Sequence, residues 1–157
     1  MSTLVRRILP GSVALALTLA GLPALADDIT TYVKDGAALG GTDPVAYFTQ
    51  GKPVQGSEAH TFTYDDVTWT FATAENRDAF AADPQKYAPQ YGGWCATGAS
   101  FGVKIPIDPA KWQIVDGKLY LNAHDGAQQR FKSDTANVIR SADENWPKIR
   151  ETPADKL

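Results

Sequence analysis

The dipeptide Asp116-Gly117 is the strongest local structural signal in this chain. It lies between two β-rich runs, residues 112–115 and 119–121. A two-residue Asp-Gly turn favours a β-hairpin because both of its positions accept positive φ, which matches the right-handed twist of the paired strands. We therefore expect a tight antiparallel hairpin in the C-terminal half of the chain.

A second β-rich pair lies earlier and runs directly into a helix. Residues 61–64 and 67–71 are rich in Thr and aromatic residues, and Asp65-Asp66 can form the turn between them. Thr73 then has the character of a helix N-cap, and the helix is expected to end at Asp83-Pro84, where a short further helical turn begins. The predicted unit here is a hairpin followed by a helix.

The segment of residues 89–99 is rich in glycine and alanine. If it forms a helix from Pro89, then Tyr91, Cys95 and Ala99 lie at i, i+4 and i+8 on one face. Glycines are poor helix formers, so their presence indicates close packing of another backbone or of a bulky ring against this segment.

The remaining signals place a strand near the start of the folded region and helix at its end. Residues 37–48 indicate a strand and a tight turn. Residues 127–146 favour helix in one or two pieces, split near Ser133-Asp134 and ended before Pro147. No internal repeat is evident. The predicted fold class is α+β, in a single domain of residues 27–157.

The first 26 residues have the composition of a cleavable secretion signal. Arg6 and Arg7 form a basic start, residues 13–22 are apolar, and Ala24-Leu25-Ala26 has the small-residue pattern of a cleavage site. The apolar run is shorter than the ~20 residues that a membrane-spanning helix needs. We expect a signal peptide over residues 1–26, a periplasmic or secreted mature protein, and no stable membrane insertion after cleavage.

Composition argues against nucleic-acid binding, disorder and disulfide bonding. The chain of 157 residues carries 15 Lys+Arg and 18 Asp+Glu, a net charge of −3, which does not suit a nucleic-acid-binding surface. Its hydrophobic fraction of 43% is that of a folded globule. Cys95 is the one cysteine, so no intramolecular disulfide can form.

Several motifs together resemble a YHS domain. Gly41-Thr42-Asp43-Pro44-Val45-Ala46-Tyr47-Phe48 precedes the hairpin and helix of residues 64–87. Tyr91-Gly92-Gly93-Trp94-Cys95 and the segment 112–146 further resemble small secreted bacterial members of that family. The resemblance implies a compact, treble-clef-like core of β-hairpins and short helices over about residues 37–100, with a C-terminal hairpin and helical extension over residues 101–157. It also implies an association with heavy-metal handling.

The chain departs from the metal-linked members of that family at three positions. Those members carry one cysteine after Asp-Pro-Val and two more around the helix start, at positions that align with Ala46, Ala72 and Asn76. Soft thiolates are what select Cu(I) or Zn²⁺ at such a site. Because all three thiols are absent, the usual metal site of the family does not carry over to this chain.

His60, Cys95 and His124 are the two histidines and the one thiol of the chain. Folding could bring them together as a metal site, with Cys95 as a thiolate and the imidazoles as neutral nitrogen donors. Such a set suits copper better than zinc, which would want a fourth ligand. The alternative is that Cys95 is a small buried core residue, His60 is exposed and His124 is a turn residue.

Three hypotheses for function follow. The first is a non-enzymatic periplasmic metal-binding protein that handles copper through Cys95 with histidine. The second is a metal-free module that binds a protein or a small ligand, in which Tyr91, Trp94 and Trp69 line a pocket beside a structural Cys95. The third is a thiol redox-active protein, which requires an accessible Cys95 of lowered pKa. No catalytic residues are predicted, because no orienting third residue or oxyanion-hole signature accompanies a Cys-His pair.

Overall fold

The computed structural model describes residues 29–157, so the predicted signal peptide lies outside the described residues. Within this range the protein has six α-helices, three 3-10 segments and three two-stranded antiparallel sheets. This mixed content confirms the predicted α+β class. Among the described residues, the helices are all too short or too polar to cross a lipid bilayer.

Both predicted hairpins are present. β3 (Ser57–Tyr64) pairs with β4 (Val67–Phe71), and β5 (Asp108–Val115) pairs with β6 (Lys118–Asn122). The four turn residues all have positive φ, at 50° and 61° in the first hairpin and 52° and 74° in the second. These are the backbone conformations that two-residue hairpin turns require.

The helices after β4 begin at side-chain caps, as expected. α2 (Ala74–Ala82) starts after Thr73, whose hydroxyl accepts the N–H of Asn76 at 3.1 Å. α3 (Pro84–Tyr87) starts after Asp83, whose carboxylate accepts the N–H of Lys86 at 3.3 Å. Pro84 takes the first position of α3, where its missing N–H costs no hydrogen bond.

The chain before β3 contains less strand than expected. β1 (Val33–Lys34) pairs with β2 (Ala37–Ala38), and the 3-10 segment η1 (Leu39–Gly41) follows immediately. The next element is helix α1 (Ala46–Thr49). The predicted strand in residues 37–48 is thus limited to two residues, and Gly40-Gly41 form the tight turn.

Residues 89–99 are not one helix, which corrects the sequence expectation. The 3-10 segment η2 (Gln90–Gly93) has φ of 55° at Tyr91 and 60° at Gly92, and helix α4 covers only Ala96–Ser100. A Cβ on Gly92 would lie 1.9 Å from Thr30 O, so the N-terminal backbone packs directly on this turn. The close backbone approach that the glycines predicted is present, but it breaks the helix and leaves Cys95 as the N-cap residue of α4.

The C-terminal helices are α5 (Asp125–Ser133) and α6 (Thr135–Ile149), divided where the sequence predicts. α6 continues past Pro147, contrary to the expected end. The N–H of Arg150 donates to Trp146 O at 2.9 Å, and Ile149 is buried. Burial of Ile149 stabilises the last turn after the proline. A 3-10 segment, η3 (Ala154–Lys156), follows.

The hairpins and the helices after them form a structural repeat, which corrects the expectation of no repeat. β3, β4, α2 and α3 each begin 51 positions before β5, β6, α5 and α6, as from Ser57 to Asp108. A register irregularity also recurs at the same place, between Ser57 and Thr61 in one sheet and between Asp108 and Trp112 in the other. The second hairpin is therefore the structural counterpart of the first.

The repeat includes the glycine turns before the hairpins. Residues 39–41 have φ of 56°, 61° and 83°, and residues 91–93 have φ of 55°, 60° and 82°. Just after these turns the N–H of Asp43 donates to Val54 O at 2.9 Å, and the N–H of Cys95 donates to Ile105 O at 3.0 Å. We call residues 39–87 the first repeat and residues 91–149 the second repeat; Asp43 and Cys95 take corresponding places in them.

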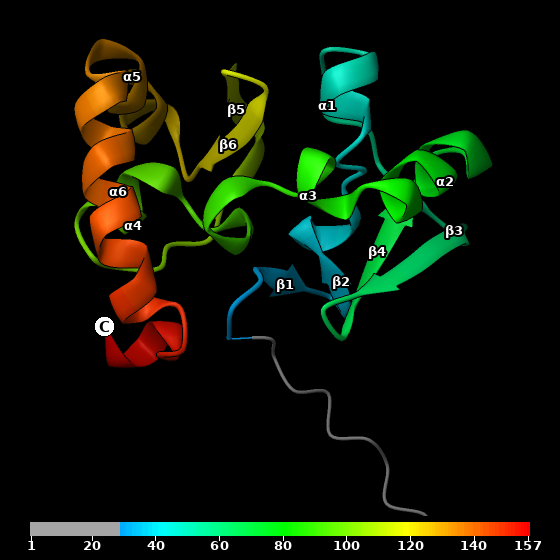
Figure 1. Ribbon diagram of the computed structural model, residues 1–157, viewed down its shortest axis with the longest axis horizontal. Helices are drawn as coiled ribbons and strands as arrows, with labels where there is room; N and C mark the ends of the chain where they lie inside the picture. Colours follow the sequence, from blue (N-terminus) through cyan, green and yellow to red (C-terminus); the bar gives the residue numbers. More distant parts are fainter. Residues whose placement is uncertain (1–28) are drawn as a thin grey trace, which may run out of the picture.

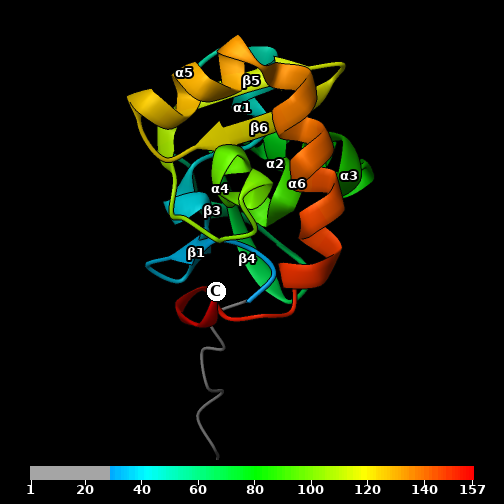
Figure 2. The same cartoon turned by 90° about the vertical axis from the view of Figure 1, so that its left-hand side faces the viewer.

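Strand β6 joins the two repeats because its alternate residues face different cores. Leu119 and Leu121 pack in a cluster with Phe80 of the first repeat, whereas Tyr120 packs in a cluster with Phe131 of the second. Alternate side chains of a strand point to opposite faces, so one short strand contributes to both clusters. Figure 1 shows α4, α5 and α6 on one side of the molecule and β3, β4 and α2 on the other, and Figure 2 views it from the α4, α5 and α6 side.

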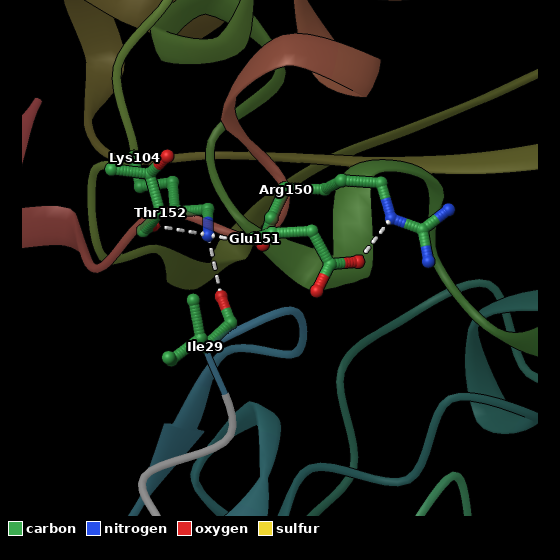
Figure 3. A network of polar contacts seen from close by, with 5 residues as sticks. All are labelled: Ile29, Lys104, Arg150, Glu151 and Thr152. Carbon is green, nitrogen blue, oxygen red and sulfur yellow. Dashed lines mark hydrogen bonds and ion pairs between the residues drawn. The ribbon is translucent and has the colours of Figure 1, made fainter.

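Lys104 connects the first described residues to the C-terminal segment (Figure 3). Its Nζ donates to the backbone carbonyl oxygens of Ile29 at 2.6 Å, Arg150 at 2.7 Å and Thr152 at 2.8 Å. The ammonium also lies 5.8 Å from the ring centroid of Trp94 and 5.4 Å from that of Trp146. Carbonyl oxygens and ring faces replace the water that this buried cation loses.

Candidate functional site

A pocket of about 260 Å³ lies beside Cys95, between α4 and the start of α5. Its lining residues come from α4 and the loop after it, and from α5 and the residues before it: Cys95, Thr97, Gly98, Phe101, Ile105, Ala123, His124, Gly126, Ala127 and Arg130. We call this the Cys95 pocket. Most of its wall is apolar, and its polar side chains are a thiol, a hydroxyl, an imidazole and a guanidinium.

Cys95 forms part of the pocket wall, but its side chain has no solvent-exposed surface. Cys95 has 0% exposure, and its Sγ caps α4 by accepting the N–H of Gly98 at 3.3 Å. Burial raises the pKa of this thiol, while the N–H groups of Gly98, Ala123 and Thr97 lower it by smaller amounts. The thiol is therefore protonated at neutral pH. Reactive cysteines have the opposite character, so this environment does not favour the thiol-redox hypothesis.

Asn122, the last residue of β6, fixes the wall of the pocket around the thiol. It is fully buried, and its Oδ1 accepts the N–H of Thr97 at 3.2 Å and lies 2.8 Å from Thr97 Oγ1 and 3.7 Å from Cys95 Sγ. Thr97 Oγ1 also lies 2.9 Å from Ala127 O. The Nδ2 of Asn122 has no partner among the described residues. These contacts hold α4, β6 and α5 in a fixed arrangement.

His124 caps α5 with its ring at the pocket. Its Nδ1 accepts the N–H of Ala127 at 3.2 Å, so the proton of the neutral ring lies on Nε2. Nε2 is the ring nitrogen that this cap does not use. His124 is exposed, and it can present either an N–H donor or, when the ring proton moves to Nδ1 and the cap on Ala127 is lost, a nitrogen ligand.

Arg130 lies six residues after His124 on α5, over the ring of Phe101. Its guanidinium carbon is 5.5 Å from the ring centroid. In the part of the chain that the structure describes, Arg130 takes part in no ion pair. Phe101 itself is 66% exposed, which is unusual for a large apolar side chain. Together the two side chains give the pocket a cation and an open aromatic face.

The pocket is positively charged although the chain is acidic overall. The net charge of the chain is −3, yet no Asp or Glu lines the pocket. Asp125 lies beside His124 in sequence, but its carboxylate pairs with Lys111 Nζ at 2.5 Å, and this pairing lowers its pKa. The local charge is therefore set by Arg130.

The structure brings two of the three predicted metal ligands to one pocket. Cys95 and His124 both line it, whereas His60 lies on β3 of the first repeat and is not among its lining residues. Within residues 29–157, no group of three or more His, Cys, Asp and Glu side chains is placed to hold a metal ion. Of the three predicted copper ligands, Cys95 and His124 therefore line the same pocket.

The three aromatic residues predicted to line a pocket beside Cys95 do not line this one. Tyr91 lies in the core of the second repeat, where its hydroxyl donates to Asp143 Oδ1 at 2.9 Å. Trp69 lies in the core of the first repeat, and Trp94 borders a different cavity, with Tyr32. The aromatic ring at the Cys95 pocket is that of Phe101.

In the first repeat the place of Cys95 is taken by the carboxylate of Asp43, which four N–H donors satisfy. Oδ1 accepts the N–H groups of Val45 at 2.8 Å and Ala46 at 3.3 Å. Oδ2 accepts the N–H of Ala72 at 2.9 Å and the side-chain amide of Asn76 at 2.7 Å. Ala46, Ala72 and Asn76 are the positions where the YHS resemblance places thiols, so this chain uses them to hold a carboxylate.

The second repeat lacks the last of these donors. Thr97 and Gly98 follow Cys95 as Val45 and Ala46 follow Asp43, and Ala123 is the counterpart of Ala72. The counterpart of Asn76 is Ala127, which has no polar side chain to reach Cys95. Thr97, Gly98, Ala123 and Ala127 all border the Cys95 pocket, so the pocket lies where the first repeat has the Asn76 side chain.

Sequence reasoning missed Phe101, Ala127 and Arg130. The available signal was the repeated Gly-Gly pair, Gly40-Gly41 and Gly92-Gly93, which would have aligned the two halves. The Gly-Gly pairs are 52 positions apart, whereas the hairpins and the helices after them are 51 apart, because the second half has one residue fewer between its turn and its hairpin. With that one-residue gap, the alignment pairs Asn76 with Ala127 and marks the place where a polar side chain is missing.

Comparisons of the chain with protein-family models, with curated proteins and with solved structures found no match.

Proposed function

We propose that this protein is a non-enzymatic binding protein that holds a small ligand in the Cys95 pocket. The observation that carries the proposal is the pocket itself, with about 260 Å³ of space, a mostly apolar wall and polar groups from Thr97, His124 and Arg130. Small-molecule sites are concave and mainly apolar, with a few polar groups that orient the ligand. The volume lies just below the usual range of about 300–1,000 Å³ for such sites, so the ligand is small.

The state of the pocket side chains supports binding in preference to catalysis. A nucleophilic cysteine needs a thiolate and a base in hydrogen-bond reach. Cys95 is buried with a raised pKa, and the Nδ1 of His124 is engaged in capping α5. The two residues therefore stabilise helix starts at the pocket wall. With the signal peptide that the sequence predicts, the binding protein would act in the periplasm or outside the cell.

The test is a fragment screen by ligand-observed NMR, repeated on Ala127→Asn. This substitution places in the second repeat the side chain that occupies the corresponding position of the first repeat, so it should put an amide into the part of the pocket beside Cys95 and obstruct a ligand there. Ala136→Asn on the exposed face of α6 is the matched control. We expect fragments that bind the wild type and Ala136→Asn and do not bind Ala127→Asn. Fragments that bind all three proteins equally would contradict the proposal.

A second candidate ligand is a soft metal ion, most plausibly copper, and it is favoured by the shared position of Cys95 and His124. Metal binding would release the thiol proton and move the proton of the neutral imidazole from Nε2 to Nδ1, which breaks the cap on Ala127. Because the thiol proton must leave, binding should weaken in acid. Titration with Cu(I) against a competing chelator tests it. His124→Asn keeps an N-cap residue, Cys95→Ser removes the soft donor, and His60→Ala changes a histidine outside the pocket. Binding that is lost in the first two variants and kept in the third supports a two-ligand copper site; unchanged binding in Cys95→Ser rejects it.

A further inference from the structure

We propose that the ligand of the Cys95 pocket is a small organic anion, a carboxylate with a compact apolar body. This inference rests on the proposed function and adds the chemical class of the ligand. It follows from the charge of the pocket, from the arrangement of Arg130 over Phe101, and from the difference between the two repeats.

The charge of the pocket favours an anion. Arg130 is a permanent cation with no ion-pair partner among the described residues, and no acidic side chain lines the pocket. Arginine carries five N–H donors in a planar fork that matches the two oxygens of a carboxylate. Nε2–H of His124 is a further donor on the same wall, since Nδ1 is occupied by the cap. Because no carboxylate of the protein lines the pocket, these N–H donors are available to a ligand.

The position of Arg130 leaves its donors available. A guanidinium over an aromatic ring interacts through its face, while its N–H groups point outward in the guanidinium plane. The ring of Phe101 and the side chain of Ile105 are 66% and 38% exposed at the same pocket. Exposed apolar groups next to an unpaired cation suit a ligand with an apolar body and one anionic end.

The repeat shows that these side chains are not required by the fold. The counterpart of His124 is Thr73, which caps α2 equally well through its hydroxyl. The counterpart of Arg130 is Ala79, and that of Ala127 is Asn76, whose amide donates to Asp43. The first repeat thus builds the same hairpin and helix with alanine at the place of Arg130 and with the Asn76 side chain at the place of Ala127. Only the second repeat combines the Arg130 cation, the Nε2–H donor of His124 and an open pocket beside them. An anionic ligand needs this combination.

The experiment compares phenylacetate with phenylacetamide, its neutral analogue of nearly the same shape, by titration of the full mature chain. We expect phenylacetate to bind about tenfold more tightly, as a charge-assisted pair with arginine gives. Arg130→Gln should reduce that preference to about equal binding, and Ala127→Asn should abolish binding of both compounds. Lys132→Gln, an exposed charge change on the same helix, should leave the preference intact.

The outcomes separate the two proposals. If both compounds bind equally to the wild type and neither binds Ala127→Asn, the pocket binds small ligands and the anion inference is wrong. A preference for phenylacetate that survives in Arg130→Gln also overturns it. If neither compound binds at millimolar concentration while the fragment screen finds neutral ligands of the pocket, the anion inference fails alone. If no compound of any class binds, both proposals fail.

Discussion

Lys104 should contribute far more to stability than an exposed lysine. Its ammonium donates to three backbone carbonyl oxygens from two distant segments, and Lys104→Met keeps the aliphatic stem while removing all three donors. The three hydrogen bonds are part-buried and all come from one charged donor, so we expect the free energy of unfolding to fall by about 3 kcal/mol. Urea denaturation measures the change, and Lys132→Met on α5 is the control. A loss below about 1 kcal/mol would contradict this role of Lys104.

The buried thiol of Cys95 gives a prediction for stability at high pH. Burial raises the pKa of Cys95 from its ordinary value of 9.0, so the folded state favours the protonated thiol. That contribution is fully present below the ordinary pKa and is lost as the pH rises through the folded pKa. The stability advantage of the wild type over Cys95→Ser should therefore shrink between pH 7 and about pH 10. Urea denaturation at both pH values measures it; an advantage that grows with pH would show that the thiolate is the favoured form.

At the scale of single elements, the turn η2 depends on glycine at position 92. Gly92 has φ of +60°, and a Cβ there would meet Thr30 O at 1.9 Å. Gly92→Ala therefore combines left-handed strain of about 1–2 kcal/mol with a backbone collision. Gly36→Ala is the matched control, since Gly36 has φ of +79° and nothing within 4 Å of the added Cβ.

We expect Gly36→Ala to lower the melting temperature by a few degrees, and Gly92→Ala to lower it much further or to prevent folding. Circular dichroism on heating measures both. Equal shifts in the two variants would mean that the N-terminal segment does not pack on η2.

Local rules predicted the elements that local sequence controls. The two hairpins follow from Asp65-Asp66 and Asp116-Gly117, and the start of α2 follows from Thr73, because turn and cap geometry depend on a few neighbouring residues. The break at residues 90–95 and the continuation of α6 beyond Pro147 depend on contacts from far along the chain, namely Thr30 against Gly92 and the burial of Ile149. Such contacts leave no local signal.

The candidate site could be predicted only in part, for the same reason. Cys95 and His124 were predicted as partners from their chemistry, and they line one pocket. Phe101 and Arg130 carry no motif, and the place of Ala127 is marked only by the alignment of the two halves of the chain, which pairs it with Asn76. No local pattern marks a space left by an absent side chain.

On the scale of the whole molecule, the two repeats should unfold together. Leu121 of β6 is fully buried in the core of the first repeat, while Tyr120 beside it packs in the core of the second. Leu121→Ala should cost about 2–5 kcal/mol. Because β6 belongs to both cores, the transitions followed by tryptophan fluorescence and by far-UV circular dichroism should shift together and stay coincident. Separate transitions for the two signals would show that the repeats are independent units.

The most direct test of the account is an NMR titration of the ¹⁵N-labelled protein with phenylacetate, in which backbone amide shifts are mapped on the structure. We predict that the largest shifts occur at Gly98, Gly126 and Ala127, with little change at their counterparts in the first repeat, and that Ala127→Asn removes them. Shifts centred on another cavity, or no shifts at concentrations where ligands of this size bind, would contradict a ligand site at Cys95.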